Sequence, residues 1–171
     1  MAAEQAWYVA ERAEALATLF LTRRNDLEVI PSGRYGRNTN YNLLVRIAMD
    51  RTSTETRETT FAIEVKGIRS EKKRGEHAFL VNYTRSELRN VGLPICVFLF
   101  AVDDEQGYYR WLFEPVISPH GKAELRFGLD VTPDDPARHE QVSIRSDFEP
   151  LTGLAIDVII ERVKHWYALK G

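Results

Sequence analysis

The chain has 171 residues, of which 44% are apolar and 28% charged, and its net charge is −2. This length suits one domain around one core, and the balanced charge gives no sign of nucleic-acid binding through bulk positive charge. The single cysteine, Cys96, excludes a disulfide framework and suits a reducing cytoplasm. Neither a signal peptide nor a membrane span is visible, so we expect a cytoplasmic protein that does not contact a membrane.

The first half of the chain is predicted to form one helix and three strands. Apolar residues recur at helical spacing over Glu4–Asn25, and no Gly or Pro interrupts them. A short strand over Leu27–Ile30 is followed by a polar loop rich in turn-forming residues. Strands over Tyr41–Ala48 and Thr59–Lys66, joined by a charged, Thr-rich connection, indicate an antiparallel hairpin.

The second half is predicted to begin with a helix over Asn82–Val91. The run Ile95–Val102 is almost continuously apolar, which is typical of a strand at the buried centre of a sheet. Further strands are predicted over Tyr108–Val116, Lys122–Leu129 and Gln141–Arg145. A closing helix over Leu151–Leu169 has an apolar stripe made of Leu154, Val158, Ile159, Val163, Trp166 and Tyr167. This order predicts a single α/β domain over residues 1–171.

The segment with the most chemical content is Glu64-Val65-Lys66. Alternation along a strand places Glu64 and Lys66 on one face, about 7 Å apart. A carboxylate there can hold a hard cation such as Mg²⁺, and an ammonium can stabilise phosphate charge. The alternative is a surface ion pair on an edge strand. Pairing the hairpin about the middle of its loop places Asn42 opposite Gly67, and it places Asp50 about 16 Å from Glu64, too far to share a metal.

These elements together resemble the PD-(D/E)XK nuclease superfamily. The resemblance lies in the order of a helix with Glu, a strand opening at an acidic position, a strand with Glu-x-Lys, a helix and a buried strand. The run Ile95–Asp103 followed by Gly107–Pro115 resembles one bacterial branch, which has a Tyr-Tyr-x-Trp-Leu strand. The resemblance implies a restriction-endonuclease-like core over about 4–116, with a mixed central sheet flanked by helices. It does not extend to the C-terminal region over about 117–171, where the sequence pattern predicts a strand pair and a helix.

The resemblance also implies roles for individual residues. Glu64 would be a metal-binding carboxylate and Lys66 the catalytic lysine, with Asn42, Glu64 and Val65 around Mg²⁺ or Mn²⁺. Asn42 stands where the superfamily has Asp, so the site lacks a negative charge that would hold the metal. An engineered inactive variant and a natural loss of catalysis both explain this departure. The superfamily often adds a Glu from the first helix, and Glu14 fits better than Glu11.

The preference for Glu14 follows from the helical wheel. Glu14 lies at the border of the apolar face, where a carboxylate needs a partner, whereas Glu11 points further toward solvent. A solvated helix flank is the alternative for either residue. Basic side chains in nearby loops are candidate phosphate contacts, and the alternative is that they are ordinary solvated charges. The candidates are Arg34, Arg37, Lys72, Lys73 and Arg74.

Three functions are compatible with these observations. The first is a Mg-dependent DNA endonuclease in bacterial defence or DNA processing, working beside a partner ATPase or as a homo-oligomer, as the resemblance implies. The second is a non-catalytic binding or assembly module that retains the nuclease fold and packs Val163, Trp166 and Tyr167 of the closing helix against a partner. The third is an α/β domain in which Glu-x-Lys is accidental. The choice between DNA and RNA stays open.

Overall fold

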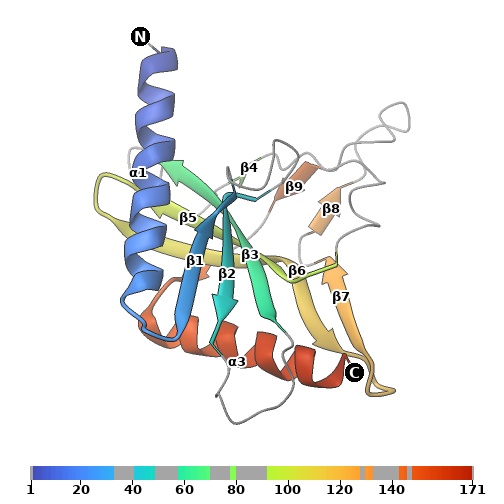
Figure 1. The fold of residues 1–171 in the computed structure, drawn as a ribbon. Helices are drawn as coiled ribbons and strands as arrows, with labels where there is room; N and C mark the ends of the chain where they lie inside the picture. The colour runs from blue at the N-terminus through green and yellow to red at the C-terminus, as the bar shows by residue number, and fades with distance from the viewer. Residues whose placement is uncertain are drawn as a thin grey trace.

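The computed structural model describes residues 2–32, 41–48, 58–69, 78–79, 92–127, 130–132, 143–145 and 148–170. Over these ranges the chain is an α/β protein with a mixed, open sheet of seven strands, a three-stranded sheet and two helices (Figure 1). The helices are α1 (Ala2–Thr22) and α3 (Gly153–Leu169). The strands are β1 (Leu27–Pro31), β2 (Leu43–Ile47), β3 (Thr59–Ile68), β4 (Ala78–Phe79), β5 (Ile95–Ala101), β6 (Gln106–Ile117), β7 (Ala123–Phe127), β8 (Asp130–Thr132), β9 (Ser143–Arg145) and β10 (Glu149–Pro150).

The large sheet has the order β1-β2-β3-β5-β6-β10, and β7 also pairs with β6. Its strand pairs are antiparallel except for β3 and β5, which are parallel. All seven residues of β5 are buried, which confirms the predicted central strand. Cys96 lies within it, fully buried, and its thiol donates a hydrogen bond to the carbonyl oxygen of Arg110 at 3.3 Å. The small sheet has the order β4-β9-β8.

Both helices pack on the same face of the large sheet. The core there combines Phe61, Ile63 and Val65 of β3 with residues of α1 and α3. The opposite face carries a smaller cluster that includes Ala62 and Val97. Because side chains alternate along β3, Glu64 and Lys66 lie on the face of Ala62, away from the two helices. No helix in the described ranges is long and apolar enough to cross a membrane.

Helix α1 approaches β3 most closely at Gly67. A Cβ atom added to this glycine would lie 2.6 Å from the carbonyl oxygen of Val9 and 3.0 Å from the Cβ of Ala13. Since Val9 contributes backbone at this contact, the helix can rest on the strand only where the side chain is a hydrogen. The strand was predicted to end at Lys66, whereas β3 continues through Gly67 to Ile68.

The buried stripe of α3 differs from the predicted one. Leu154 and Val158 are 74% and 55% exposed, so their predicted place in the core is wrong. The helix turns Ile156 and Ile160 inward instead, and these positions lie about 200° around the helix from Leu154 and Val158. The buried residues of α3 are Ile156, Ile159, Ile160, Val163 and Trp166.

The aromatic end of α3 binds its own domain. The Trp166 indole Nε1 donates to the carbonyl oxygen of Glu124 at 2.8 Å, and the Tyr167 hydroxyl donates to that of Thr60 at 2.9 Å. Val163 is fully buried. The helix thus closes its own core as predicted, and the alternative in which these side chains pack against a partner is wrong, because their polar and apolar groups are already used inside the domain.

Other element bounds differ at their ends. Helix α1 ends at Thr22 rather than Asn25, where the Thr22 hydroxyl donates to the carbonyl oxygen of Thr18 at 2.7 Å. The short strands β4, β8 and β10 were not predicted. The predicted helix over Asn82–Val91 and the connection between β2 and β3 lie outside the described residues.

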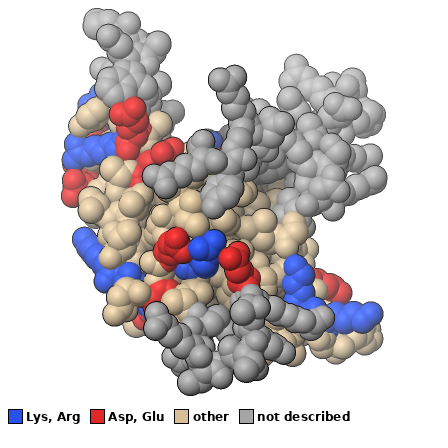
Figure 2. Space-filling view, in the orientation of Figure 1, with Lys and Arg blue, Asp and Glu red and all other residues tan. Residues whose placement is uncertain are grey.

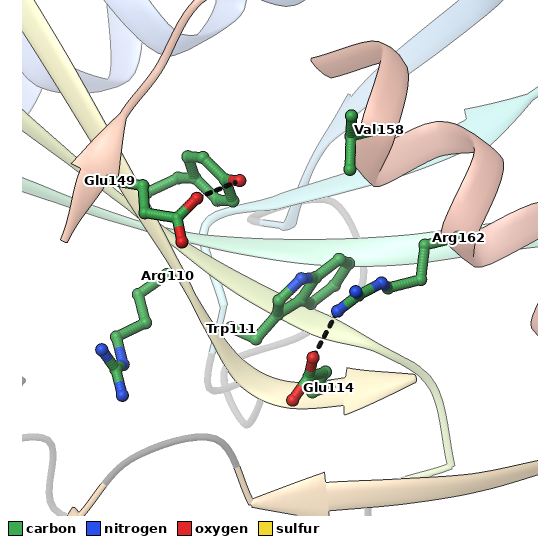
Figure 3. Close-up of a pocket in the computed structure, with 7 residues that line it drawn as sticks. Arg110, Trp111, Glu114, Glu149, Val158 and Arg162 are labelled. Carbon is green, nitrogen blue, oxygen red and sulfur yellow. Dashed lines mark hydrogen bonds and ion pairs between the residues drawn. The ribbon is translucent and has the colours of Figure 1, made fainter. Parts of the chain in front are cut away.

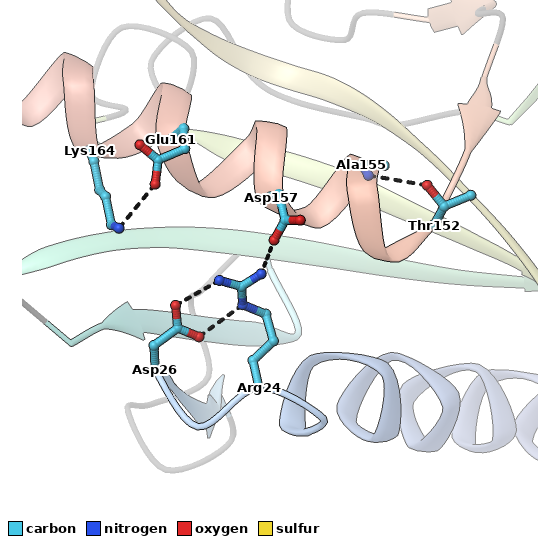
Figure 4. Close-up of polar contacts among 7 residues, drawn as sticks. All are labelled: Arg24, Asp26, Thr152, Ala155, Asp157, Glu161 and Lys164. Carbon is cyan, nitrogen blue, oxygen red and sulfur yellow. Dashed lines mark hydrogen bonds and ion pairs between the residues drawn. The ribbon is translucent and has the colours of Figure 1, made fainter.

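Arg24 joins the end of α1 to β1 and α3 (Figure 4). Its guanidinium binds both carboxylate oxygens of Asp26, at 2.8 and 2.7 Å, and a third contact reaches Asp157 of α3. The hydrogen bonds from Arg24 lower the pKa of Asp26. We call this two-oxygen contact between Arg24 and Asp26 the fork. It places one guanidinium group at the point where the chain leaves α1 and enters the sheet.

We expect R24Q to reduce the free energy of unfolding at pH 7 by about 1 kcal/mol, since the two side chains of the fork are about a third exposed and water screens them. The folded-state pKa of Asp26 is depressed, so its contribution is present above the unfolded pKa of about 4 and is lost as pH falls through the folded value. Urea unfolding at pH 7 and pH 3 measures this. The control is R23Q, since Arg23 lies over the Phe20 ring; equal losses in both variants would contradict the prediction.

Candidate functional site

The register of the β2–β3 hairpin sets the neighbours of Asn42. Leu43 pairs with Ile63, and the Asn42 backbone N–H donates to the Ile63 carbonyl oxygen at 2.9 Å. Continued by one residue, this register places Asn42 opposite Glu64. The predicted pairing with Gly67 is therefore wrong by three positions, and the correction brings Asn42 closer to the Glu64 carboxylate.

Burial explains why the hairpin takes this register. The observed pairing sets Leu43 against Ile63, and both residues are buried on the helix-covered face. The predicted pairing would set Leu43 against Lys66. It would then place a charged side chain on the sheet face that packs into the core. A shift by an odd number of residues reverses the face of every side chain, so the buried face selects the register.

The side-chain amide of Asn42 bridges α1 and β3. Its Oδ1 accepts a hydrogen bond from the Val65 backbone N–H at 2.7 Å, and its Nδ2 donates to Oε1 of Glu14 at 2.7 Å. These partners fix the amide orientation, because an N–H must meet an acceptor and a carboxylate must meet a donor. Glu14 thus contacts Asn42, while Glu11 is exposed.

Glu64 and Lys66 form an ion pair on the face opposite the helices. The Lys66 Nζ lies 2.9 Å from Oε1 of Glu64. Glu64 is only 8% exposed, whereas the Lys66 side chain is 40% exposed. The carboxylate is therefore anchored in the protein, and the ammonium is accessible to a negatively charged ligand.

With asparagine at position 42, these donors do not fit a divalent cation. Mg²⁺ prefers oxygen ligands, and the Asn42 amide turns its N–H toward Glu14 while its oxygen is engaged by Val65. The Val65 side chain has no ligating atom, so only its backbone carbonyl oxygen could act as a ligand. Within the described ranges, no three His, Cys, Asp or Glu side chains are grouped to hold a metal.

Sequence reasoning missed two side chains on the site's face of the sheet. Glu64 is paired with Val97, which is paired in turn with Arg110, so Arg110 emerges from the same face two strands away. At about 4.8 Å per strand, their backbones are about 10 Å apart. By the same rule, Tyr108 belongs to the row of Lys66. The sequence held a signal for this, since the segment between the predicted strands Ile95–Val102 and Tyr108–Val116 is short, and a short turn fixes which side chains of two paired strands share a face.

The candidate phosphate-binding residues could not be placed. Arg34, Arg37, Lys72, Lys73 and Arg74 all lie outside the described residues. On the face shown in Figure 2, acidic and basic side chains of the described part are interspersed. Arg46, for example, pairs with Glu28 and Glu58.

No protein-family model, curated protein or solved structure matches the chain. The fold and the site therefore define a class only: an α/β domain whose mixed sheet carries a Glu–Lys pair on one face, next to an asparagine that ties the sheet to the first helix.

Proposed function

We propose that this chain is a nuclease-type domain of the PD-(D/E)XK class, built for phosphodiester hydrolysis in DNA and silenced by Asn42. In this proposal the domain has a restriction-endonuclease-like fold and serves in bacterial defence or DNA processing, beside an ATPase or as an oligomer. Mg²⁺ or Mn²⁺, bound by an active form, would supply an activated water and neutralise charge on the phosphate.

The observation that carries the proposal is that three segments meet at one point of β3, where the Glu64–Lys66 pair flanks the residue that binds Asn42. Glu14 of α1 bonds to Asn42, which lies just before β2 and bonds to Val65 of β3. Val65 lies between Glu64 and Lys66, which pair with each other. Segments separated by 28 and 23 residues are thus joined at one point of the sheet.

Each residue has a role that its position supports. The accessible ammonium of Lys66 would bind the scissile phosphate and orient the attacking water. The Glu64 carboxylate holds that ammonium in place. Arg110, on the same face, would contact a neighbouring phosphate of an extended strand. Glu14 supplies a second carboxylate beside position 42.

A non-catalytic binding module is the second candidate. The favouring observation is that both ends of the Asn42 amide have complementary partners, so asparagine fits this position as a structural link. Such a module would retain the phosphate-binding face and lack hydrolysis.

The test is cleavage by N42D. We expect N42D to cut plasmid DNA with Mg²⁺ or Mn²⁺, because a carboxylate at position 42 would add the missing anionic ligand. N42D/E64A should lose this activity by about 100-fold or more. The parent chain should be inactive under the same conditions. If N42D cleaves neither plasmid, single-stranded DNA nor RNA, the silenced-nuclease proposal fails and the binding module replaces it.

A further inference from the structure

A cavity of about 360 Å³ lies between β6 and α3, on the helix-covered side of the sheet. It opens where β6 changes partners: β10 pairs with Tyr108 and Tyr109, and β7 pairs with β6 from Phe113 onward. A volume of this order accommodates a small molecule. The residues that line it are Tyr109, Arg110, Trp111, Glu114, Glu149, Val158 and Arg162 (Figure 3).

Trp111 presents a hydrogen-bond donor to this cavity. The residue is 8% exposed, and no acceptor for its indole N–H occurs among the described residues. Figure 3 shows the Trp111 indole among the side chains that line the cavity. In the described part of the chain the Trp111 nitrogen is not one of the fully buried side-chain atoms that lack a partner, so it is accessible to solvent at the cavity, where a ligand oxygen can accept its hydrogen bond.

Arg162 adds further donors beside the indole. One guanidinium nitrogen of Arg162 binds Glu114, and its other nitrogens have no partner in the described part of the chain. Glu114 also binds Arg126, at 2.6 Å. Because two guanidinium groups face one carboxylate, the cluster keeps a net positive charge next to the indole N–H. That combination suits an anionic oxygen.

The other end of the cavity has the opposite character. The Tyr109 hydroxyl donates to Oε2 of Glu149 at 2.8 Å. Burial, together with this hydrogen bond, raises the pKa of Tyr109 to about 12, so the phenol keeps its proton at neutral pH. The second oxygen of Glu149 accepts no hydrogen bond from the described residues. It is therefore suited to a ligand group that donates.

We infer that this cavity binds a small organic anion whose carboxylate or phosphate accepts hydrogen bonds from Trp111 and Arg162 and whose other end donates to Glu149. The inference does not depend on the proposed nuclease site, because Trp111, Arg162 and Glu149 have no role in it. A ligand here would join β6 to α3, since one binding group comes from each element.

The test uses the ¹⁵N-labelled full chain and follows the indole N–H resonance of Trp111, assigned by its loss in W111F. Four probes are titrated: acetate, inorganic phosphate, β-alanine and phosphoethanolamine. We expect a saturable shift with at least one aminated probe and weaker binding of its plain counterpart. Binding of acetate and β-alanine would indicate a carboxylate ligand, and binding of inorganic phosphate and phosphoethanolamine would indicate a phosphate ligand.

The variants are chosen to separate binding from folding. R162Q should weaken binding about tenfold or more, because it removes a charged donor. R162K keeps a charge beside Glu114 but has fewer donors, so it should also bind more weakly than the parent. K164Q is the control, since Lys164 lies on the same helix outside the cavity and pairs with Glu161. No saturable shift with any probe, or parental affinity in both Arg162 variants, overturns the inference. If the probes with an amino group bind no more tightly than those without one, the inference that the ligand donates a hydrogen bond to Glu149 is overturned.

Discussion

Replacing Gly67 with alanine is expected to lower the free energy of unfolding by about 2–3 kcal/mol, a large effect for one methyl group. The added carbon would lie 2.6 Å from the Val9 carbonyl oxygen and 2.7 Å from its Cγ1. Since backbone is on one side of this contact, a rotamer change cannot relieve it. Helix α1 must then move away from β3, or the strand must bend. Chemical denaturation of the parent and variant measures the loss.

The matched control is G92A, because nothing lies within 4 Å of a Cβ at Gly92. Its free energy of unfolding should equal that of the parent or exceed it slightly, since alanine restricts the unfolded chain. A displaced α1 would also withdraw Glu14 from Asn42, so G67A/N42D should cleave DNA less than N42D does. Equal stability of G67A and G92A would show that α1 does not rest on Gly67 as described.

Replacing Asn42 with aspartate is the second change with a large expected effect. In N42D a carboxylate would face Glu14 at the position of a 2.7 Å hydrogen bond, so attraction becomes repulsion. We expect N42D to unfold about 2 kcal/mol more easily than the parent in the presence of EDTA. Mg²⁺ or Mn²⁺ should restore much of that stability, because a cation between the carboxylates stabilises only the folded chain. Thermal unfolding with and without metal measures both.

Two variants separate repulsion from a lost hydrogen bond. N42A loses both contacts of the amide without adding charge, so its stability should not respond to metal. N42D/E14Q exchanges donor and acceptor, since an amide at position 14 can donate to a carboxylate at position 42. It should recover most of the stability in EDTA. An unstable N42D/E14Q would indicate that the Val65 contact, rather than the pairing with Glu14, determines the effect.

The parts of the site that depend on local periodicity could be predicted from the sequence. Alternation placed Glu64 and Lys66 on one face, and the helical wheel placed Glu14 at the border of the apolar face; the observed contacts agree with both. These patterns hold because the geometry of a strand or helix is fixed over a few residues. The α/β class followed from the order of the elements.

What could not be predicted depends on how distant segments meet. The position of Asn42 was wrong because a loop of unknown shape was treated as symmetrical, although burial of Leu43 held the correct answer. The stripe of α3 was wrong because apolar residues on both sides of that helix leave its rotation open. The cavity beside Trp111 combines strands and a helix that are far apart in sequence, and no local pattern marks it.

The buried thiol in β5 can report how often the central strands of the large sheet separate. Cys96 is the single cysteine and is fully buried at the centre of the large sheet, and burial raises its pKa. A thiol-alkylating reagent reacts with the thiolate, which forms only after the strand is exposed. The labelling rate under native conditions therefore measures how often the middle of the sheet separates, without any denaturant. Each variant discussed above can be ranked on that kinetic scale without an introduced probe.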